Sequence, residues 1–144
     1  MYLKLGTKIE LDNKITNQII LQKIRLVLEG YRFDNIETIN DSVHFRNNFW
    51  EFGFSGSYKS HISKGFLEIM IEDNKTKIFY KSYISIWGYL AVISFIAIVG
   101  SYVNDFFIIG FLVLFFGLFL SYLTVKKGNL ALMNKVKVKI EHNE

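Results

Sequence analysis

The chain of 144 residues contains no cysteine and no proline. Without cysteine the protein has no disulfide, no thiolate metal site and no thiol nucleophile, whichever compartment it occupies. The missing proline, beside abundant Phe, Ile, Asn and Lys, is typical of the codon bias of a low-GC bacterial genome, and it predicts nothing about the fold. The absence of cysteine therefore limits the chemistry that the protein can perform, whereas the absence of proline does not.

Catalytic and metal-binding patterns are also sparse. The histidines His44, His61 and His142 form no pair at i, i+4 and have no carboxylate spaced as in a zinc helix, so we expect no metal site. The sequence has no Gly-x-Ser-x-Gly elbow and no carboxylate pair placed for acid–base catalysis. Residues 53–59 are rich in Gly and Ser but lack Walker spacing. We therefore expect no cofactor and no enzymatic activity.

Charge of one sign is not concentrated in the N-terminal region. The chain has a net charge of +4 and a pI near 9.2, but acidic and basic residues nearly balance over residues 1–83. Much of the excess lies in residues 126–144, where five lysines face only Glu141 and Glu144. Such a distribution creates no strong field for a polyanion, so we expect no nucleic-acid partner.

Charge is missing altogether from two long apolar runs, 84–103 and 106–125, which only Asn104 and Asp105 separate. Each run has about the ~20 residues that a helix needs to cross ~30 Å of hydrocarbon. The two runs therefore predict a transmembrane helical hairpin. Small residues along both runs would let the helices approach each other closely or leave a face for a partner.

The flanking charges predict the orientation of this hairpin. Lysines precede the first run and follow the second, whereas the turn carries only Asp105, so the positive-inside rule places both termini in the cytoplasm. We expect a multi-pass protein of the cytoplasmic (inner) membrane, without a signal peptide because charges interrupt residues 1–28. The residues expected at the membrane interface are Trp87, Tyr89, Tyr122, Lys126 and Lys127.

Residues 1–83 predict a small cytoplasmic α+β module. Helical spacing of apolar residues begins at Ile15 and ends near Gly30, which suits a left-handed C′ position, while Thr16 or Asn13 is placed to cap the start. The segments 33–39, 43–46, 66–72 and 77–83 read as strands of two hairpins, and 1–11 permits a short strand. The pattern of the tail 126–144 fits either a helix or a strand, and we favour a mainly helical tail with some extended structure at its end.

The segment 47–63 mixes aromatic residues with Gly and Ser, and we expect it to form an interaction surface. Its candidate residues are Trp50, Phe52, Phe54, Tyr58 and His61. The favoured function is a non-enzymatic accessory or scaffold subunit that binds the lipid bilayer and another membrane protein or a second copy of itself. One alternative is a membrane-bound sensor of a ligand or lipid headgroup, or an enzyme, that uses the loop from Gly53 to Lys64. In that loop His61 would act as acid or base, and Lys59 or Lys64 would hold an anionic or lipid headgroup. Another is a pore formed by hairpin oligomers, which the apolar runs disfavour because they offer no polar lining.

Overall fold

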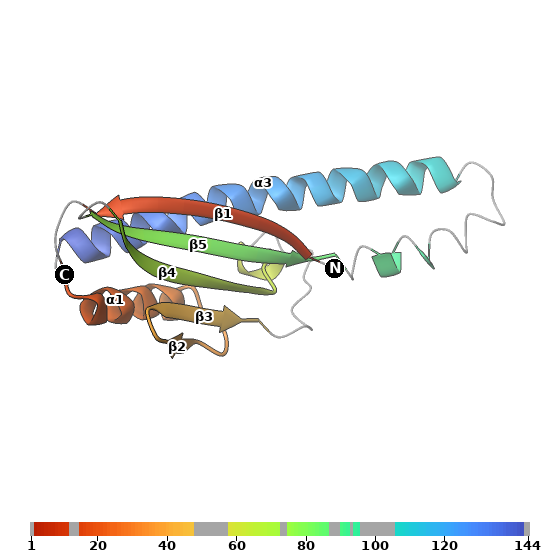
Figure 1. The fold of residues 1–144 in the computed structure, drawn as a ribbon. Helices are drawn as coiled ribbons and strands as arrows, with labels where there is room; N and C mark the ends of the chain where they lie inside the picture. The colour runs from red at the N-terminus through yellow and green to blue at the C-terminus, as the bar shows by residue number, and fades with distance from the viewer. Residues whose placement is uncertain are drawn as a thin grey trace.

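The fold is α+β, with a five-stranded antiparallel sheet and a long apolar helix near the C-terminus (Figure 1). The computed structural model describes residues 2–11, 15–47, 58–72, 75–86, 90–92, 94–95 and 106–142. In chain order the elements are β1 (Tyr2–Leu11), α1 (Asn17–Gly30), β2 (Glu37–Ile39), β3 (Ser42–Arg46), the 3-10 helix η2 (Lys59–His61), β4 (Lys64–Glu72), β5 (Lys75–Ser85) and α3 (Phe106–Glu141).

The sheet has the strand order β1-β5-β4-β3-β2, and every neighbouring pair is antiparallel. Strands β2 to β5 lie in chain order. The pairs β2–β3 and β4–β5 are the two predicted hairpins, although β2 covers only 37–39 of the predicted 33–39. The first strand, β1, pairs with the last, β5. Tyr2 lies opposite Ser85, and Leu11 lies opposite Thr76. The strand permitted at 1–11 is therefore confirmed as Tyr2–Leu11, and it pairs with β5 from Thr76 to Ser85.

Side chains alternate between the two faces of the sheet. On β5 the buried side chains of the inner face are Thr76, Ile78, Tyr80, Ser82 and Ile84, and the outer-face residues between Thr76 and Ile84 are only half-buried. Ser85, the last residue of the strand, is also buried. Alternation on β4 and β3 buries Leu67, Ile69, Val43 and Phe45 on the same inner face. This face meets both α1 and α3, so one hydrophobic core joins the sheet and the two helices.

Of the stripe that its spacing predicts, helix α1 buries Ile20, Ile24, Val27 and Leu28, whereas Ile19 is exposed. Its ends differ from the prediction. Thr16 stands at the N-cap without a capping side-chain hydrogen bond, and Gly30 is the last helical residue and does not adopt a left-handed conformation. Arg32 takes the left-handed conformation instead, with φ of 59°, so the chain reverses two residues later than expected and brings Phe33 into the core.

Helix α3 continues without a break through the apolar run and the basic tail. Along residues 121–140 one face is buried, at spacings of three and four residues: Ser121, Val125, Asn129, Leu132, Met133, Val136 and Ile140. This face lies against β1, β5 and α1. The helical interpretation of the tail is therefore confirmed to Glu141, and the strand alternative is wrong, because helical spacing lets this one face fill the core beside β1.

The first half of α3 is different, because it exposes large apolar side chains. Within residues 111–120 these are Phe111, Leu112, Phe115, Phe116, Phe119 and Leu120, and Phe115 is 64% exposed. In Figure 1 this half projects past the end of the sheet that carries the N-terminus. The change from exposed to buried apolar side chains occurs within a single helix.

The described residues contain one helix, Gly110–Glu141, that is long and apolar enough to cross a membrane, where the sequence predicts two in a hairpin. The predicted first run, 84–103, starts too early, because Ile84 and Ser85 belong to β5 and pair with Leu3 and Tyr2. Pairing with β1 satisfies their backbone groups and buries Ile84 in the core. Of the remainder, 87–89, 93 and 96–103 lie outside the described residues, as does the predicted turn at Asn104 and Asp105.

Replacing Leu132 with Ala is expected to lower the free energy of unfolding by about 2–5 kcal/mol, because Leu132 is fully buried and its truncation leaves a cavity between α3 and the sheet. Leu130→Ala is the matched control on the same helix, since Leu130 is 49% exposed, and it should change stability by about 0.5 kcal/mol or less. Chemical denaturation of the full chain in one detergent measures both. Equal losses would contradict the docking of α3.

Candidate functional site

A buried group of polar side chains joins α3 to the sheet and to the segment before η2. Asn129 of α3 is 1% exposed. Its Nδ2 donates to Ser82 Oγ at 2.9 Å, and its Oδ1 accepts a hydrogen bond from the Tyr58 hydroxyl at 2.7 Å. The Tyr58 hydroxyl also lies 2.9 Å from that of Tyr80 on β5. A buried polar group without a hydrogen-bond partner destabilises the fold, so these bonds fix the rotation of α3 about its axis and its position along the sheet.

Aromatic rings surround Tyr58 and hold it in this position. Its ring centroid lies 5.9 Å from that of Tyr31 and 6.2 Å from that of Phe33, both in edge contacts. Across the helix interface, Gly128 lies so close that a Cβ there would overlap the Tyr58 ring. The glycine therefore serves close packing rather than an unusual backbone conformation.

Burial governs the protonation of the two tyrosines. Removal from water raises the pKa of Tyr58 far above its ordinary value of 10.0, and the nearby Tyr80 hydroxyl raises it further. Burial likewise raises the pKa of Tyr80. Both phenols stay neutral and can donate hydrogen bonds, which suits a structural junction. Ionisation, which a nucleophile or base at this position would require, is strongly disfavoured.

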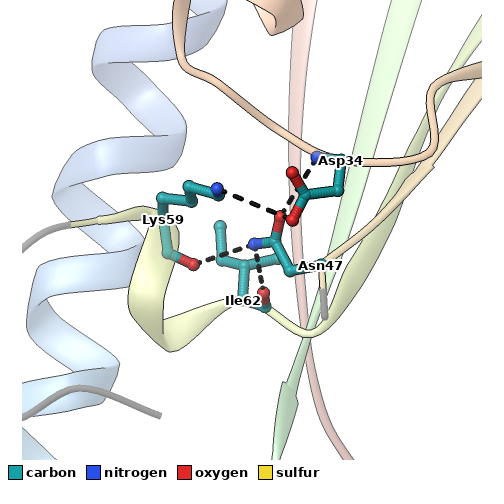
Figure 2. Close-up of polar contacts among 4 residues, drawn as sticks. All are labelled: Asp34, Asn47, Lys59 and Ile62. Carbon is teal, nitrogen blue, oxygen red and sulfur yellow. Dashed lines mark hydrogen bonds and ion pairs between the residues drawn. The ribbon is translucent and has the colours of Figure 1, made fainter. Parts of the chain in front are cut away.

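A second set of contacts fixes the η2 turn itself (Figure 2). Asn47 Nδ2 donates to the carbonyl oxygens of Lys59, at 3.0 Å, and Ile62, at 2.8 Å. The backbone N–H of Asp34 donates to Asn47 Oδ1 at 3.4 Å, and Lys59 Nζ lies 3.6 Å from Asp34 Oδ2. Asn47 thus holds the end of β3, the chain after α1 and the η2 turn together, and Tyr58 is placed by this turn.

The residues predicted to form the 47–63 interaction surface have different positions. Trp50, Phe52 and Phe54 lie outside the described residues. Tyr58 points inward to Asn129, as described above. His61 is half-buried on η2, and burial lowers its pKa, so the neutral imidazole is favoured near pH 7.

The three residues proposed for a ligand-sensing loop do not converge. Lys59 is directed to Asp34, whereas Lys64 Nζ lies over the Tyr2 ring, 4.6 Å from its centroid, on the opposite face of the sheet. His61 lies between these positions along the chain, on η2. Within the described ranges no group of three His, Asp or Glu side chains is placed to hold a metal ion.

Of the residues predicted at a membrane interface, Trp87 and Tyr89 lie outside the described residues. Tyr122 packs at the edge of the core, and Lys126 and Lys127 are exposed on the following turn of α3. An open groove of about 360 Å³ runs between α3 and β1 at this level. Its lining residues are Lys4, Leu5, Gly6, Thr7, Tyr122, Lys126, Asn129 and Leu130.

The face of the sheet away from the helices carries a surface that sequence analysis missed. Rings from four neighbouring strands follow one another across it, with centroid distances of 6.4 Å from Tyr2 to Tyr83, 6.5 Å from Tyr83 to Phe66 and 5.3 Å from Phe66 to His44. Lysines lie over these rings, as Lys81 does at 4.9 Å from the centroid of Phe66. The alternation of Lys with aromatic residues on β4 and β5 was the available signal.

Comparison with protein-family models, with curated proteins and with solved structures finds no match to this chain.

Gly128→Ala is expected to destabilise the fold by about 1–3 kcal/mol, because the added methyl group overlaps the Tyr58 ring and must displace it. Gly30→Ala is the matched control: this helical glycine has open space around its Cβ position, so alanine should be neutral or stabilise by up to about 1 kcal/mol. Thermal unfolding followed by near-UV circular dichroism, which reports on tyrosine packing, measures both. Equal shifts of the two midpoints would contradict this packing.

Proposed function

We propose that this protein is an integral membrane protein that holds a cytoplasmic module against the bilayer by the first half of α3. One observation carries the proposal: six large apolar side chains of α3 are exposed within residues 111–120, whereas beyond residue 121 the same helix buries one apolar face in the core. Contiguous exposed phenylalanine and leucine side chains are unfavourable in water and favourable in hydrocarbon. The 20 residues of the run 106–125 are about the number that crosses the hydrocarbon core as a helix.

The end of this run has the chemistry of a membrane interface. Tyr122 and the exposed Lys126 and Lys127 follow the last exposed phenylalanine, Phe119. Tyrosine and lysine are favoured at the level of the headgroups, where an apolar body and a polar tip are both accommodated. The bilayer surface would then lie beside the end of the sheet formed by Tyr2, Ser85 and Lys64.

The docking of α3 on the sheet restricts the topology of such an anchor. Strand β1 and the last turns of α3 belong to one hydrophobic core. In the proposed arrangement both would therefore lie on the same side of the bilayer. A chain that returns to its starting side crosses an even number of times. The chain between Ser85 and Phe106 has about the length of one crossing. We therefore propose a two-helix hairpin, with Lys126 and Lys127 placing both termini in the cytoplasm of an inner membrane.

The proposed role is that of a non-enzymatic accessory or scaffold subunit. Because α3 runs unbroken from its exposed half into the core, the module is held next to the bilayer without a flexible tether. The outward face of the sheet, with its aromatic rings and lysines, is left uncovered by α1 and α3. A module held in this way is suited to bind another membrane protein or a second copy of itself.

Membrane insertion is tested by changing Phe115 and Phe116 together to Arg. Each arginine near the middle of a bilayer-spanning helix costs about 2.5–3.5 kcal/mol, so the variant should be extracted from membranes by alkaline carbonate. The matched control, Phe115→Leu with Phe116→Leu, keeps both side chains apolar and should stay in the membrane pellet with the unaltered chain. Extraction of the unaltered chain would contradict the proposed anchor.

The accessory role is tested by purifying the full chain from native membranes in a gentle detergent, through a tag at the N-terminus. We expect a stoichiometric membrane protein partner or a homo-oligomer, identified by mass spectrometry and by the mass of the complex. The same purification of a variant with Tyr83 and Phe66 changed to Ser tests whether the partner binds the outer face of the sheet. A lone monomer at high protein density would contradict the scaffold role and leave the membrane anchor intact.

A further inference from the structure

We propose that a row of cations at one end of the outer sheet face binds the phosphate groups of anionic phospholipids in the membrane that anchors α3. The row consists of Lys4, Lys64 and Arg46, with Tyr83 between the first two. This inference rests on the proposed function, because it takes the lipid from the same bilayer. It adds a specific ligand class, an anionic headgroup, to what the anchor alone requires.

The antiparallel registers place these residues side by side. Lys4 of β1 lies opposite Tyr83 of β5, Tyr83 lies opposite Lys64 of β4, and Lys64 lies opposite Arg46 of β3. Their sequence neighbours Leu5, Ile84, Gly65 and Phe45 are all buried on the helix side. The row therefore crosses four strands on the outer face, over roughly 15 Å at about 4.8 Å per strand.

The row carries positive charge that the described residues do not neutralise. Carboxylates of the outer face pair with lysines nearer the other end of the sheet: Glu10 and Glu72 with Lys77, and Glu68 with Lys81. In the part of the chain that the structure describes, no carboxylate lies within 4.0 Å of Lys4, Lys64 or Arg46. Like charges directly opposite on paired strands, as Lys64 and Arg46 are, destabilise a sheet. A bound phosphate would relieve this repulsion.

The aromatic rings help to fix the cations in place. Lys64 Nζ lies 4.6 Å from the centroid of the Tyr2 ring and 5.4 Å from that of the Tyr83 ring. Contacts of this kind reduce the freedom of the ammonium group while leaving its hydrogen-bond donors available to an anion. Tyr2 itself is 47% exposed at the start of β1, where an amphipathic ring suits the headgroup region.

The position of the row selects a lipid over other anions. Lys4 and Lys126 line the same groove between β1 and α3, so the row stands at the level where the exposed apolar half of α3 ends. Figure 1 shows that the start of β1 and the end of β5 lie at this end of the sheet. Headgroups of the cytoplasmic leaflet are present there at high local concentration. A nucleic acid would have to enter the narrow space between the sheet and the bilayer.

The test uses the full chain in liposomes of phosphatidylcholine and phosphatidylglycerol in equal amounts, followed by extraction in a neutral detergent and native mass spectrometry of the retained lipids. Two double variants are compared, Lys4→Gln with Lys64→Gln in the row and Lys8→Gln with Lys75→Gln at the other end of the same face. We expect phosphatidylglycerol to be enriched on the unaltered chain and on the second variant. The row variant should lose this enrichment by at least about fivefold, since a lysine near the surface contributes about 1 kcal/mol.

Equal retention of the two lipids on the unaltered chain, or equal losses in the two variants, would overturn the proposal. Inorganic phosphate and a single-stranded oligonucleotide serve as competing probes, and stronger binding of either at the row would also overturn it. Carbonate extraction of the same samples tests the anchor separately. A chain that resists extraction but shows no lipid preference refutes only this inference, whereas a chain that is extracted refutes the proposed function as well.

Discussion

Asn129 is the buried amide that the rest of the structure depends on, because its hydrogen bonds connect three parts of the chain that are distant in sequence. It binds Ser82 on β5 and the Tyr58 hydroxyl, which also contacts Tyr80. A helix that slid or rotated on the sheet would leave these groups unpaired in a dry environment, at about 1–3 kcal/mol each. Apolar packing alone is less selective, since Leu132, Val136 and Ile140 tolerate small shifts. The polar junction therefore determines where α3 leaves the sheet.

The position at which α3 leaves the sheet is important because the two halves of the helix have different surroundings. Its second half completes the core with β1 and α1, and its first half exposes phenylalanines that no described element covers. In the proposed arrangement the bilayer covers them, and the rigid passage from one half to the other sets the height of the module above the membrane. The same height brings Lys4 and Lys64 to the proposed headgroup level. In this proposal, the membrane anchor and the lipid site both depend on the packing of α3 on the sheet.

Local patterns predicted much of this fold. Alternation on β4 and β5, helical spacing in α1 and the turn at Asn40, which takes a φ of 51°, are all properties of neighbouring residues. The pairing of β1 with β5 was not predictable, because it joins residues more than sixty positions apart. For the same reason the strand extends to Ser85, into the run read as a membrane span.

The tail was ambiguous because Lys135, Lys137 and Lys139 alternate with apolar residues, and only packing against β1 and α1 selects the helix. Tyr58 was predicted to lie on a surface. Its ring packs against Gly128, which is seventy residues later in the chain, and no local sequence pattern indicates this contact.

The most direct test of this account is a spin-label accessibility scan along α3 in liposomes, which the cysteine-free chain permits because each introduced cysteine is the only one to be labelled. Labels at 112, 115, 116 and 119 are predicted to collide with oxygen from the hydrocarbon and hardly at all with a water-soluble nickel chelate. Labels at 132, 136 and 140 should be immobile and reached by neither probe, while labels at 134 and 138 should be reached by the chelate. Chelate access at 115 and 116 equal to that at 134 and 138, or mobile labels at 132 and 136, would contradict the claim that one helix joins the bilayer to the core of the sheet.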